Sequence, residues 1–138
     1  MSNDLVNSLS ISSSGMKAQS LRMRVISENI ANANSTGLTP GDMPYRRQVV
    51  SFESELDKAT GANMVKVGEV SKDPSQFQTR YMPGHPSADA DGYVKMPNVN
   101  TLVETMDMRE AQRSYEANLN VIEVSRMMIM RTIDMLRG

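Results

Sequence analysis

The sequence predicts a mainly helical protein in which two long terminal helices pair antiparallel as a coiled-coil-like hairpin, joined by a short, irregular β-rich middle. All six prolines fall between Pro40 and Pro97, and five of the six aromatic residues fall between Tyr45 and Tyr93. Proline breaks helix interiors but suits turns, so the proline-free flanks favour helix and the middle favours turns and strands. The expected parts, in chain order, are residues 1–36, 37–97 and 98–138.

In the N-terminal flank, apolar side chains recur at helical spacing over residues of about 3–34. One row has the seven-residue repeat that is typical of helix pairing: Leu9, Met16, Met23 and Ile30. A second apolar row widens the stripe beyond what one partner helix covers: Ile11, Ala18 and Val25. We expect this helix to end where Asn32, Asn34 and Gly37 can adopt a left-handed backbone.

The C-terminal flank, over residues of about 99–137, has a more regular row with the same repeat: Met108, Tyr115, Ile122, Ile129 and Leu136. The intervening positions are small or polar and permit close approach of a second helix: Ala111, Asn118, Ser125 and Thr132. A second apolar row again lies beside it: Val121, Met128 and Met135. Both terminal helices can therefore bury two faces.

These helices are long for a globular protein. Roughly 32 and 39 residues at 1.5 Å each give rods of about 48 and 58 Å, against a mean helix of about 12 residues. Pairing the two helices buries one row on each and leaves the second rows in water, so the sequence predicts an assembly. The residues expected at subunit interfaces are Leu9, Met16, Met23, Ile26, Asn29, Ile30, Asn32, Asn34, Met108, Tyr115, Asn118, Ile122, Met128, Ile129, Ile133 and Leu136.

The middle contains short runs of β-forming residues separated by turn signals. The candidate strands are 46–52, 64–70, 77–81 and 93–96. The candidate turns are 39–42, 60–63, 73–74 and 89–92. A β element of about 60 residues is too small for a deep core, so we expect it to pack on the helices or on neighbouring subunits.

The composition excludes several classes of function. The 15 Lys and Arg residues nearly balance 16 Asp and Glu, and this net charge of −1 gives no electrostatic basis for binding nucleic acid or anionic membrane. No apolar run reaches the ~18 residues that span a bilayer, and the N-terminus lacks the features of a cleaved secretory signal. The absence of Cys removes thiol nucleophiles and zinc-thiolate sites. We expect no nucleic acid, no membrane insertion and no cofactor.

Catalytic constellations are also lacking. His85 is the single histidine and lies between two prolines, where a turn-stabilising hydrogen bond is the simplest role for it. Asp89 and Asp91 begin like a calcium loop, but Tyr93 and Asn100 stand where further oxygen ligands are required. We therefore interpret this segment as a polar turn and expect no enzymatic activity; a metal-dependent hydrolase built on Asp89, Asp91 and His85 is a rival hypothesis.

Methionine is concentrated in the C-terminal flank, where six of the 13 methionines lie from Met106 onward. One interpretation is that they fill a helix core. The other is that their flexible side chains allow one helix to pack against neighbours at slightly different angles, as a polymer with non-identical contacts requires.

Two segments resemble a known family. Residues 27–37, with the sequence SENIANANSTG, closely resemble the N-terminal motif of the bacterial flagellar rod, hook and hook-associated axial proteins. Residues 113–118, RSYEAN, resemble the C-terminal motif of the same proteins. Residues 81–94 and 96–100, with Tyr45-Arg46-Arg47 and the short length, resemble the proximal-rod members of the family. The sequence departs from the family pattern at Glu28 and at Thr105-Met106-Asp107.

The resemblance implies an exported structural subunit of the proximal rod of the flagellar basal body, required for motility. Family members pass uncleaved through the flagellar type III export apparatus and stack helically into the periplasm-spanning rod. Their terminal helices surround a central channel and transmit torque, while the middle faces outward. The implied partners are copies of this chain, other rod proteins, the membrane-embedded basal ring and its adaptor at the rod base, and the export apparatus.

The asparagines of the first motif have two possible roles. Asn29, Asn32 and Asn34 can fix the register of an interface, or they can cap the end of the helix through local hydrogen bonds. Tyr115 can bury its ring while its hydroxyl finds a partner. The main alternative to a rod subunit is a soluble helical adaptor or export chaperone that binds a single partner through the same apolar rows.

Overall fold

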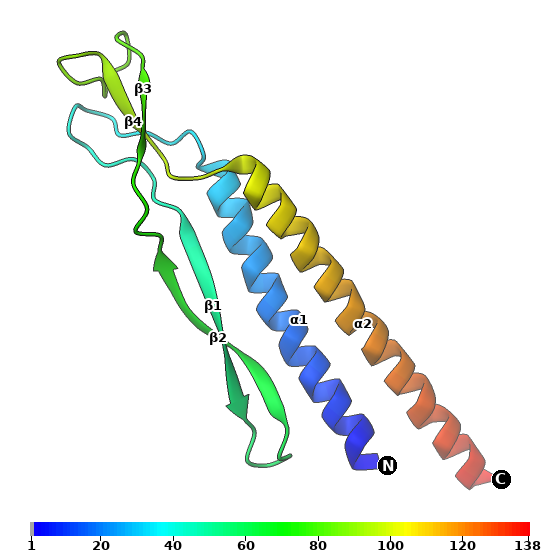
Figure 1. Ribbon diagram of the computed structural model, residues 1–138. Coiled ribbons are helices and arrows are strands. Elements are labelled where there is room, and N and C mark those ends of the chain that lie inside the picture. The colour runs from blue at the N-terminus through cyan, green and yellow to red at the C-terminus, as the bar shows by residue number, and fades with distance from the viewer. Residues whose placement is uncertain (1) are drawn as a thin grey trace. The chain divides into compact units, whose positions relative to one another are not determined.

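The computed structural model describes residues 2–138, with side chains from Asp4 onward (Figure 1). The two long helices are α1 (Ser2–Ala31) and α2 (Thr101–Arg137). The strands between them are β1 (Gln48–Leu56), β2 (Asn63–Lys72), β3 (Gln78–Tyr81) and β4 (Tyr93–Met96). They form two separate two-stranded sheets, β1 with β2 and β3 with β4. The predicted fold class, two terminal helices with a small β-rich middle, is confirmed.

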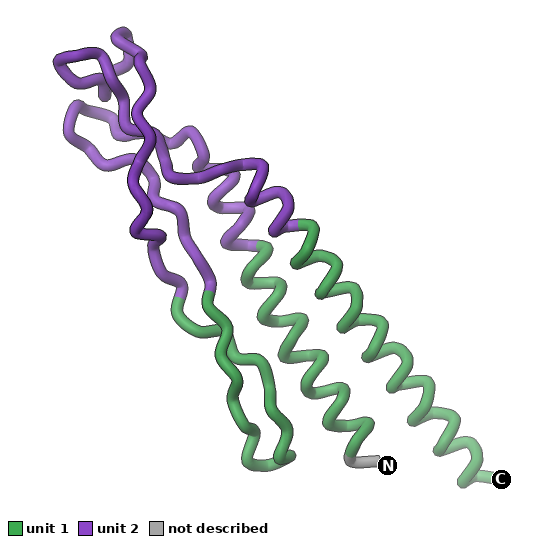
Figure 2. Tube along the Cα trace, viewed as in Figure 1, with its two compact units in different colours: residues 1–23, 51–69, 109–138 green, residues 24–50, 70–108 purple. Residues whose placement is uncertain are grey.

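The chain forms two compact units, each containing part of both helices (Figure 2). Unit 1 comprises residues 1–23, 51–69 and 109–138, and unit 2 comprises residues 24–50 and 70–108.

In unit 1 the two helices are antiparallel, because the contacts move backward along α2 as they move forward along α1. A Cβ atom added to Gly15 would lie 2.8 Å from Nδ2 of Asn118, so the backbones approach closely there. Further along, Arg22 pairs with Glu110 at 3.6 Å. The fully buried side chains of this unit are all small: Ser12, Ala18, Ala62, Ala111 and Ser125.

Unit 2 contains the small β3–β4 sheet and the residues that flank it. The strands are antiparallel, with Gln78 opposite Met96 and Tyr81 opposite Tyr93. The two tyrosine rings meet edge to face at 5.4 Å, and Gly92 provides the positive φ of +84° at the turn. Larger apolar side chains are buried here: Val25, Ile26 and Val94.

The end of α1 differs from the prediction. The helix stops at Ala31, and no described residue among Asn32, Asn34 and Gly37 has a positive φ. Instead, the Asn32 side chain donates to the carbonyl of Glu28 at 2.8 Å, which satisfies one of the last helix carbonyls locally. Gly37 has a steric role, since a Cβ there would lie 2.5 Å from Cβ of Asp42. The prediction that a left-handed backbone at Asn32, Asn34 or Gly37 ends this helix was therefore wrong.

The sequence predicted all four strands. The bounds were correct for one of them, β4. β1 begins at Gln48 rather than at residue 46; the backbone N–H of Arg47 donates to Oδ1 of the Asn98 side chain at 2.7 Å instead of to a strand. It also extends to Leu56, and the following loop is closed by Asp57, which accepts hydrogen bonds from the backbone of Ala59 and the hydroxyl of Thr60.

Candidate functional site

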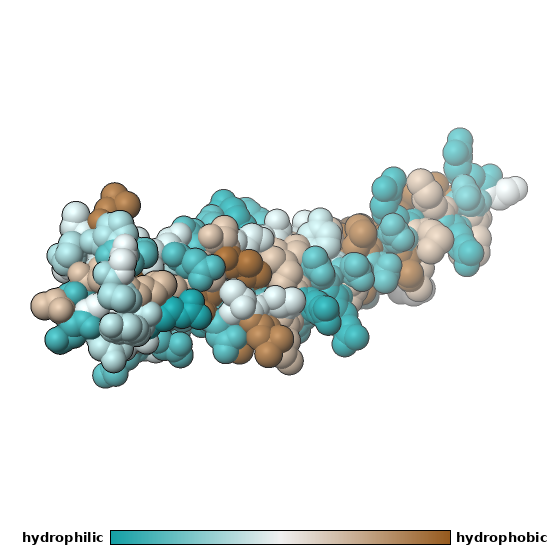
Figure 3. All heavy atoms as spheres, turned by 90° about the horizontal axis from the view of Figure 1, so that it is seen from above, coloured by the Kyte–Doolittle hydropathy of each residue, from teal (hydrophilic) through white to brown (hydrophobic). Residues whose placement is uncertain are grey.

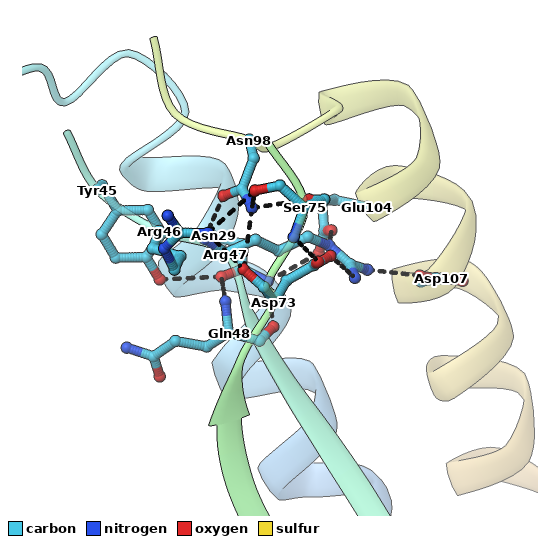
Figure 4. Close-up of polar contacts among 10 residues, drawn as sticks. All are labelled: Asn29, Tyr45, Arg46, Arg47, Gln48, Asp73, Ser75, Asn98, Glu104 and Asp107. Atoms are coloured by element: carbon cyan, nitrogen blue, oxygen red, sulfur yellow. Dashed lines mark hydrogen bonds and ion pairs between the residues drawn. The ribbon is translucent and has the colours of Figure 1, made fainter. Parts of the chain in front are cut away.

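A group of hydrogen-bonded polar side chains lies at the centre of unit 2 (Figure 4). We call it the polar cluster, and its members are Asn29, Tyr45, Arg46, Arg47, Gln48, Asp73, Ser75, Asn98, Glu104 and Asp107. They come from four segments of the chain: the last turns of α1, the residues that lead into β1 with its first residue, the residues after β2, and the stretch from Asn98 into the start of α2. The cluster thus joins segments that are far apart in sequence.

Asn29 is the innermost member, with 1% of its surface exposed. Its Nδ2 donates to the Gln48 carbonyl at 2.8 Å and to Oε2 of Glu104 at 3.1 Å. Its Oδ1 accepts from the Gln48 N–H and from the Tyr45 hydroxyl, both at 2.9 Å. An amide offers two N–H donors and two lone pairs, so Asn29 uses its full hydrogen-bonding capacity. The Asn29 side chain bonds both the N–H and the carbonyl of Gln48. It therefore pairs with the start of β1 as the backbone of a neighbouring strand would, although it belongs to a helix.

Arg47 and Glu104 form the charged centre of the cluster. Glu104 is fully buried, and its Oε1 accepts from Nε of Arg47 at 2.5 Å. The same guanidinium lies 3.4 Å from Oδ2 of Asp73 and 3.7 Å from Oδ2 of Asp107. A buried carboxylate is costly unless it is paired and hydrogen-bonded, and Arg47 with Asn29 meets both needs.

The protonation states of the cluster follow from these contacts. Partial burial lowers the pKa of Arg47, but the hydrogen bond and charge of Glu104, together with Asp73, outweigh it and leave that pKa raised. Burial, with the negative charges of Glu28 and Glu104, raises the pKa of the Tyr45 hydroxyl. Tyr45 therefore remains a neutral donor to Asn29 at physiological pH.

Asn98 and Arg46 complete the cluster at its edge. Oδ1 of Asn98 accepts from the backbone N–H of Arg47 at 2.7 Å, and its Nδ2 donates to Oγ of Ser75 at 2.9 Å. Arg46 donates to the carbonyls of Asp73 and Ser75 and lies over the Phe77 ring at 4.2 Å. These bonds hold the chain between β2 and β3 beside the chain that enters β1.

A second candidate site is the apolar surface of α2. Figure 3 shows one face of the molecule, on which hydrophobic residues lie exposed among hydrophilic ones. The α2 row of Val121, Met128 and Met135, which we call the outer row, is exposed, reaching 50% at Met128 and 75% at Met135. By contrast, four members of the seven-residue row are only partly exposed, and Leu136 at its end is exposed: the four are Met108, Tyr115, Ile122 and Ile129. The prediction that pairing leaves a second row in water is confirmed for α2.

For α1 that prediction is wrong in part. Ala18 and Val25 of its second row are buried within the chain, and only Ile11 is exposed. The β1–β2 hairpin explains Ala18, because Ala18 and residues 64–67 of β2 line the same groove of unit 1. The second face of α1 in this unit is thus covered by the chain's own strands.

His85 and the neighbouring aspartates have structural roles. Nδ1 of His85 accepts from the Ser87 N–H at 3.1 Å, which confirms a turn-stabilising hydrogen bond, and Nε2 lies 3.4 Å from Oγ1 of Thr36. Oδ1 of Asp89 accepts from the N–H groups of Asp91 and Tyr93, as a polar turn requires. Within residues 2–138, no set of three acidic or histidine side chains is placed to hold a metal ion. Neither helix, over its described length, is apolar enough to span a membrane.

Comparison with known proteins identifies the family. The family model for flagella basal body rod proteins matches residues 9–39, and the model for the C-terminal part of flagellar basal body rod FlgEFG proteins matches residues 90–135. The flagellar basal-body rod protein FlgC of Agrobacterium fabrum is 55% identical, over 93% of this chain and 92% of the relative. The FlgC proteins of Borreliella burgdorferi and Salmonella typhimurium are 40% and 39% identical, over 97% and 94% of this chain and 99% and 96% of theirs.

The chain belongs to the FlgC family of flagellar basal-body rod proteins. It is a non-enzymatic structural subunit of the basal-body rod, as the two motifs predicted. The family assignment favours this role over that of a soluble adaptor or chaperone. It also makes the apolar surface of α2, rather than any pocket, the candidate functional site.

The family motifs meet in the polar cluster of this rod protein. The segment 27–37 contributes Asn29, the Tyr45-Arg46-Arg47 segment contributes three residues, and the segment 96–100 contributes Asn98. Sequence reasoning missed Glu104, Asp73 and the central role of Arg47, because charged residues at element ends are usually solvated. The one available signal was an unusual density of polar residues in segments that resemble the family.

The predicted interface residues fall into three groups. Ile26 and Asn29 are buried inside this chain, so their contacts here are intramolecular. Partly exposed residues line the helix pair: Leu9, Met16, Met23, Ile30, Asn32, Met108, Tyr115, Asn118, Ile122 and Ile129. The exposed residues are Asn34, Met128, Ile133 and Leu136. Of the two roles open to the asparagines, Asn29 makes the long-range bonds of a register-fixing residue, whereas Asn32 bonds locally.

Proposed function

We propose that this chain is a subunit of the proximal part of the rod and polymerises helically through its terminal helices. Copies of the chain and other rod proteins would contact the outer row of α2, and the paired helices would surround the export channel and transmit torque. Residues 1–36 and 98–138, which contain the two helices, form the axial core in this proposal. Residues 37–97 form an outer domain.

The observation that supports this proposal is the exposed outer row. Large apolar side chains at Val121, Met128 and Met135 recur at one helical spacing, and a free surface of this kind in a soluble protein marks an interaction site. In unit 1, Leu5 of α1 lines a groove together with Met128 and Met135 of α2. A neighbouring helix that entered this groove would bury residues of both helices at once.

The remaining features of the proposal concern location and assembly. The chain would pass through the flagellar type III export apparatus without cleavage and span the periplasm as part of the rod. At its base it would contact the membrane-embedded ring through an adaptor. A chain without cysteine cannot form disulfides during this passage, which suits export in an unfolded state.

The test introduces charge into the outer row. Met128→Glu and Met135→Glu, separately expressed in place of the native chain, should abolish rod assembly and motility, because each would bury an unpaired carboxylate. Arg126→Gln, which changes the net charge by the same amount on the same helix, should leave motility intact. Circular dichroism of each purified variant should show unchanged helix content. Motile cells with complete rods in the two glutamate variants would contradict the proposal.

A further inference from the structure

The outer edge of β1 in unit 1 is an unpaired sheet edge. The β1–β2 sheet has two strands, so each strand has one neighbour and one edge without a strand partner. Residues 51–56 of β1 are all exposed, in contrast to the partly covered residues 48–50. A long two-stranded hairpin is marginally stable alone, and an uncovered strand edge is a template for another strand.

The two edges of this hairpin are treated differently by the fold. The backbone N–H of Val65 in β2 donates to Oγ of Ser14 at 3.3 Å, so α1 covers the edge of β2 (Figure 1). Residues 64–67 of β2, together with the side chain of Glu55 from β1, line a groove with Ser14, Lys17 and Ala18 of the same helix. Helix α1 therefore protects β2 and leaves β1 as the strand available for pairing.

The two faces of β1 have different chemistry. Alternation along a strand places Ser51, Glu53 and Glu55 on one face and Phe52 and Leu56 on the other. A Cβ added to Gly68 would lie 3.4 Å from Oε1 of Glu53, and Lys66 pairs with Glu55 at 3.3 Å, so the acidic face is shared with β2. The opposite face carries two apolar side chains, Phe52 39% and Leu56 57% exposed, with Ser54 between them.

Independently of the helix contacts proposed above, we infer that the outer edge of β1 receives an extended segment of a partner protein by strand addition. The segment has Lys or Arg at every second position and apolar residues between them. Its basic side chains lie beside Glu53 and Glu55, as Lys66 already does on the inner side of β1. Its apolar side chains cover Phe52 and Leu56, and its backbone pairs with the unpaired edge.

The same acidic residues disfavour pairing of β1 with itself. Two copies of β1 joined edge to edge would bring their acidic faces together and place like charges on neighbouring strands. Charged residues on an edge strand are a known defence against self-association. Glu53 and Glu55 thus select a basic partner strand over a second copy of β1.

The test uses the full-length chain and two synthetic eight-residue peptides, one of alternating Lys and Val and one of alternating Glu and Val. Amide hydrogen exchange is followed residue by residue. The Lys–Val peptide should slow exchange by roughly tenfold at every second residue of 51–56, where the backbone N–H points away from β2, and the Glu–Val peptide should not.

Charge variants then test the specificity. Glu53→Lys with Glu55→Lys should transfer protection from the Lys–Val to the Glu–Val peptide, whereas Glu116→Lys with Glu123→Lys, an equal charge change on α2, should leave the preference unchanged. Because Lys at position 55 faces Lys66, the milder Glu53→Gln with Glu55→Gln pair is also measured and should weaken Lys–Val binding severalfold. Equal protection by both peptides, protection outside β1, no protection at all, or unchanged binding by the Gln variant would each overturn the inference.

Discussion

The two compact units differ in what they bury. Unit 2 encloses large and polar side chains, above all Asn29 and Glu104, and satisfies them with bonds from four segments of the chain. Among its described side chains, from Asp4 onward, unit 1 buries only small ones, such as Ala18 and Ala111, and leaves Met128 and Met135 exposed. Since buried apolar area is the main source of stability, unit 1 gains little stability from its own helix contacts.

This difference separates two tasks of the same helix pair. In unit 2 the polar cluster fixes the register of the chain against itself, because each of its groups has a specific partner. In unit 1 close packing on small residues brings the helices together, while their large apolar side chains stay partly or largely exposed. The apolar area that remains exposed is then available to neighbouring subunits, which is the arrangement expected of a chain that completes its fold on assembly.

The largest effect is expected from removing the buried charge of the polar cluster. Glu104→Ala should lower the free energy of unfolding by about 4 kcal/mol, because Arg47 loses its main partner inside the protein. Glu110→Ala, which removes an exposed carboxylate from a pair with Arg22 on the same helix, should cost less than about 0.5 kcal/mol. Urea denaturation of both variants makes the comparison, and equal losses would show that the cluster has no special role.

A somewhat smaller loss is expected at Asn29. Asn29→Ala removes four hydrogen bonds and leaves the Gln48 backbone and the Tyr45 hydroxyl without their partner, at a cost of about 3 kcal/mol. Asn32→Ala removes a local bond to Glu28 and should cost under about 1 kcal/mol. Hydrogen exchange at the Gln48 amide provides a local readout: it should rise strongly in the first variant and stay unchanged in the second.

Substitution of Gly15 should change stability by an amount that depends on the residue at position 118. Gly15→Ala alone should be nearly neutral, because the gain in helix propensity of about 1 kcal/mol is offset by displacement of the Asn118 side chain. In an Asn118→Ala background the same substitution should stabilise by about 1 kcal/mol. Thermal denaturation of the four proteins in this cycle is the measurement. Additive effects would mean that the helices do not approach closely at this point.

The smallest effect concerns acid pH. Hydrogen bonds from the backbone and side chain of Ser75, with a further contribution from Arg47, lower the pKa of Asp73 below its ordinary 3.8. A lowered folded-state pKa means that this stabilisation is complete above pH 3.8 and is lost as pH falls through the folded-state value. NMR titration of the Asp73 carboxylate should show this, and Asp73→Asn should remove the contribution that this titration adds to the intrinsic pH dependence of Ser75 amide exchange. Titration of Asp73 at or above 3.8 would contradict the assignment.

The sequence was sufficient to predict the elements but not the polar cluster. Apolar residues repeated at a spacing of seven located both helices, and Tyr93–Met96 was identified as a strand at its correct bounds. Both signals are local in sequence. The start of α2 was also close, since Asn100 caps it by accepting from the Leu102 N–H at 3.0 Å.

Long-range polar contacts were beyond such reasoning. Nothing near Glu104 in sequence indicates that Arg47 will reach it, and a glutamate in the first turn of a helix is ordinarily exposed. The same limit explains the second row of α1, where burial of Ala18 depends on a hairpin that folds beside the helix. Local patterns specify the surfaces of an element, whereas its partner within the chain depends on the tertiary fold.

The central claim, that the outer row of α2 is left exposed for neighbouring subunits, is tested most directly by cysteine accessibility. The chain has no cysteine, so Met128→Cys and Lys95→Cys each introduce a single thiol on an exposed side chain. Maleimide labelling is compared between the purified protein and isolated basal bodies. We expect Met128→Cys to react in the free protein and to be protected in the rod, while Lys95→Cys, in the middle part that we propose faces outward, reacts in both. Equal labelling of Met128→Cys in the two states would contradict the claim.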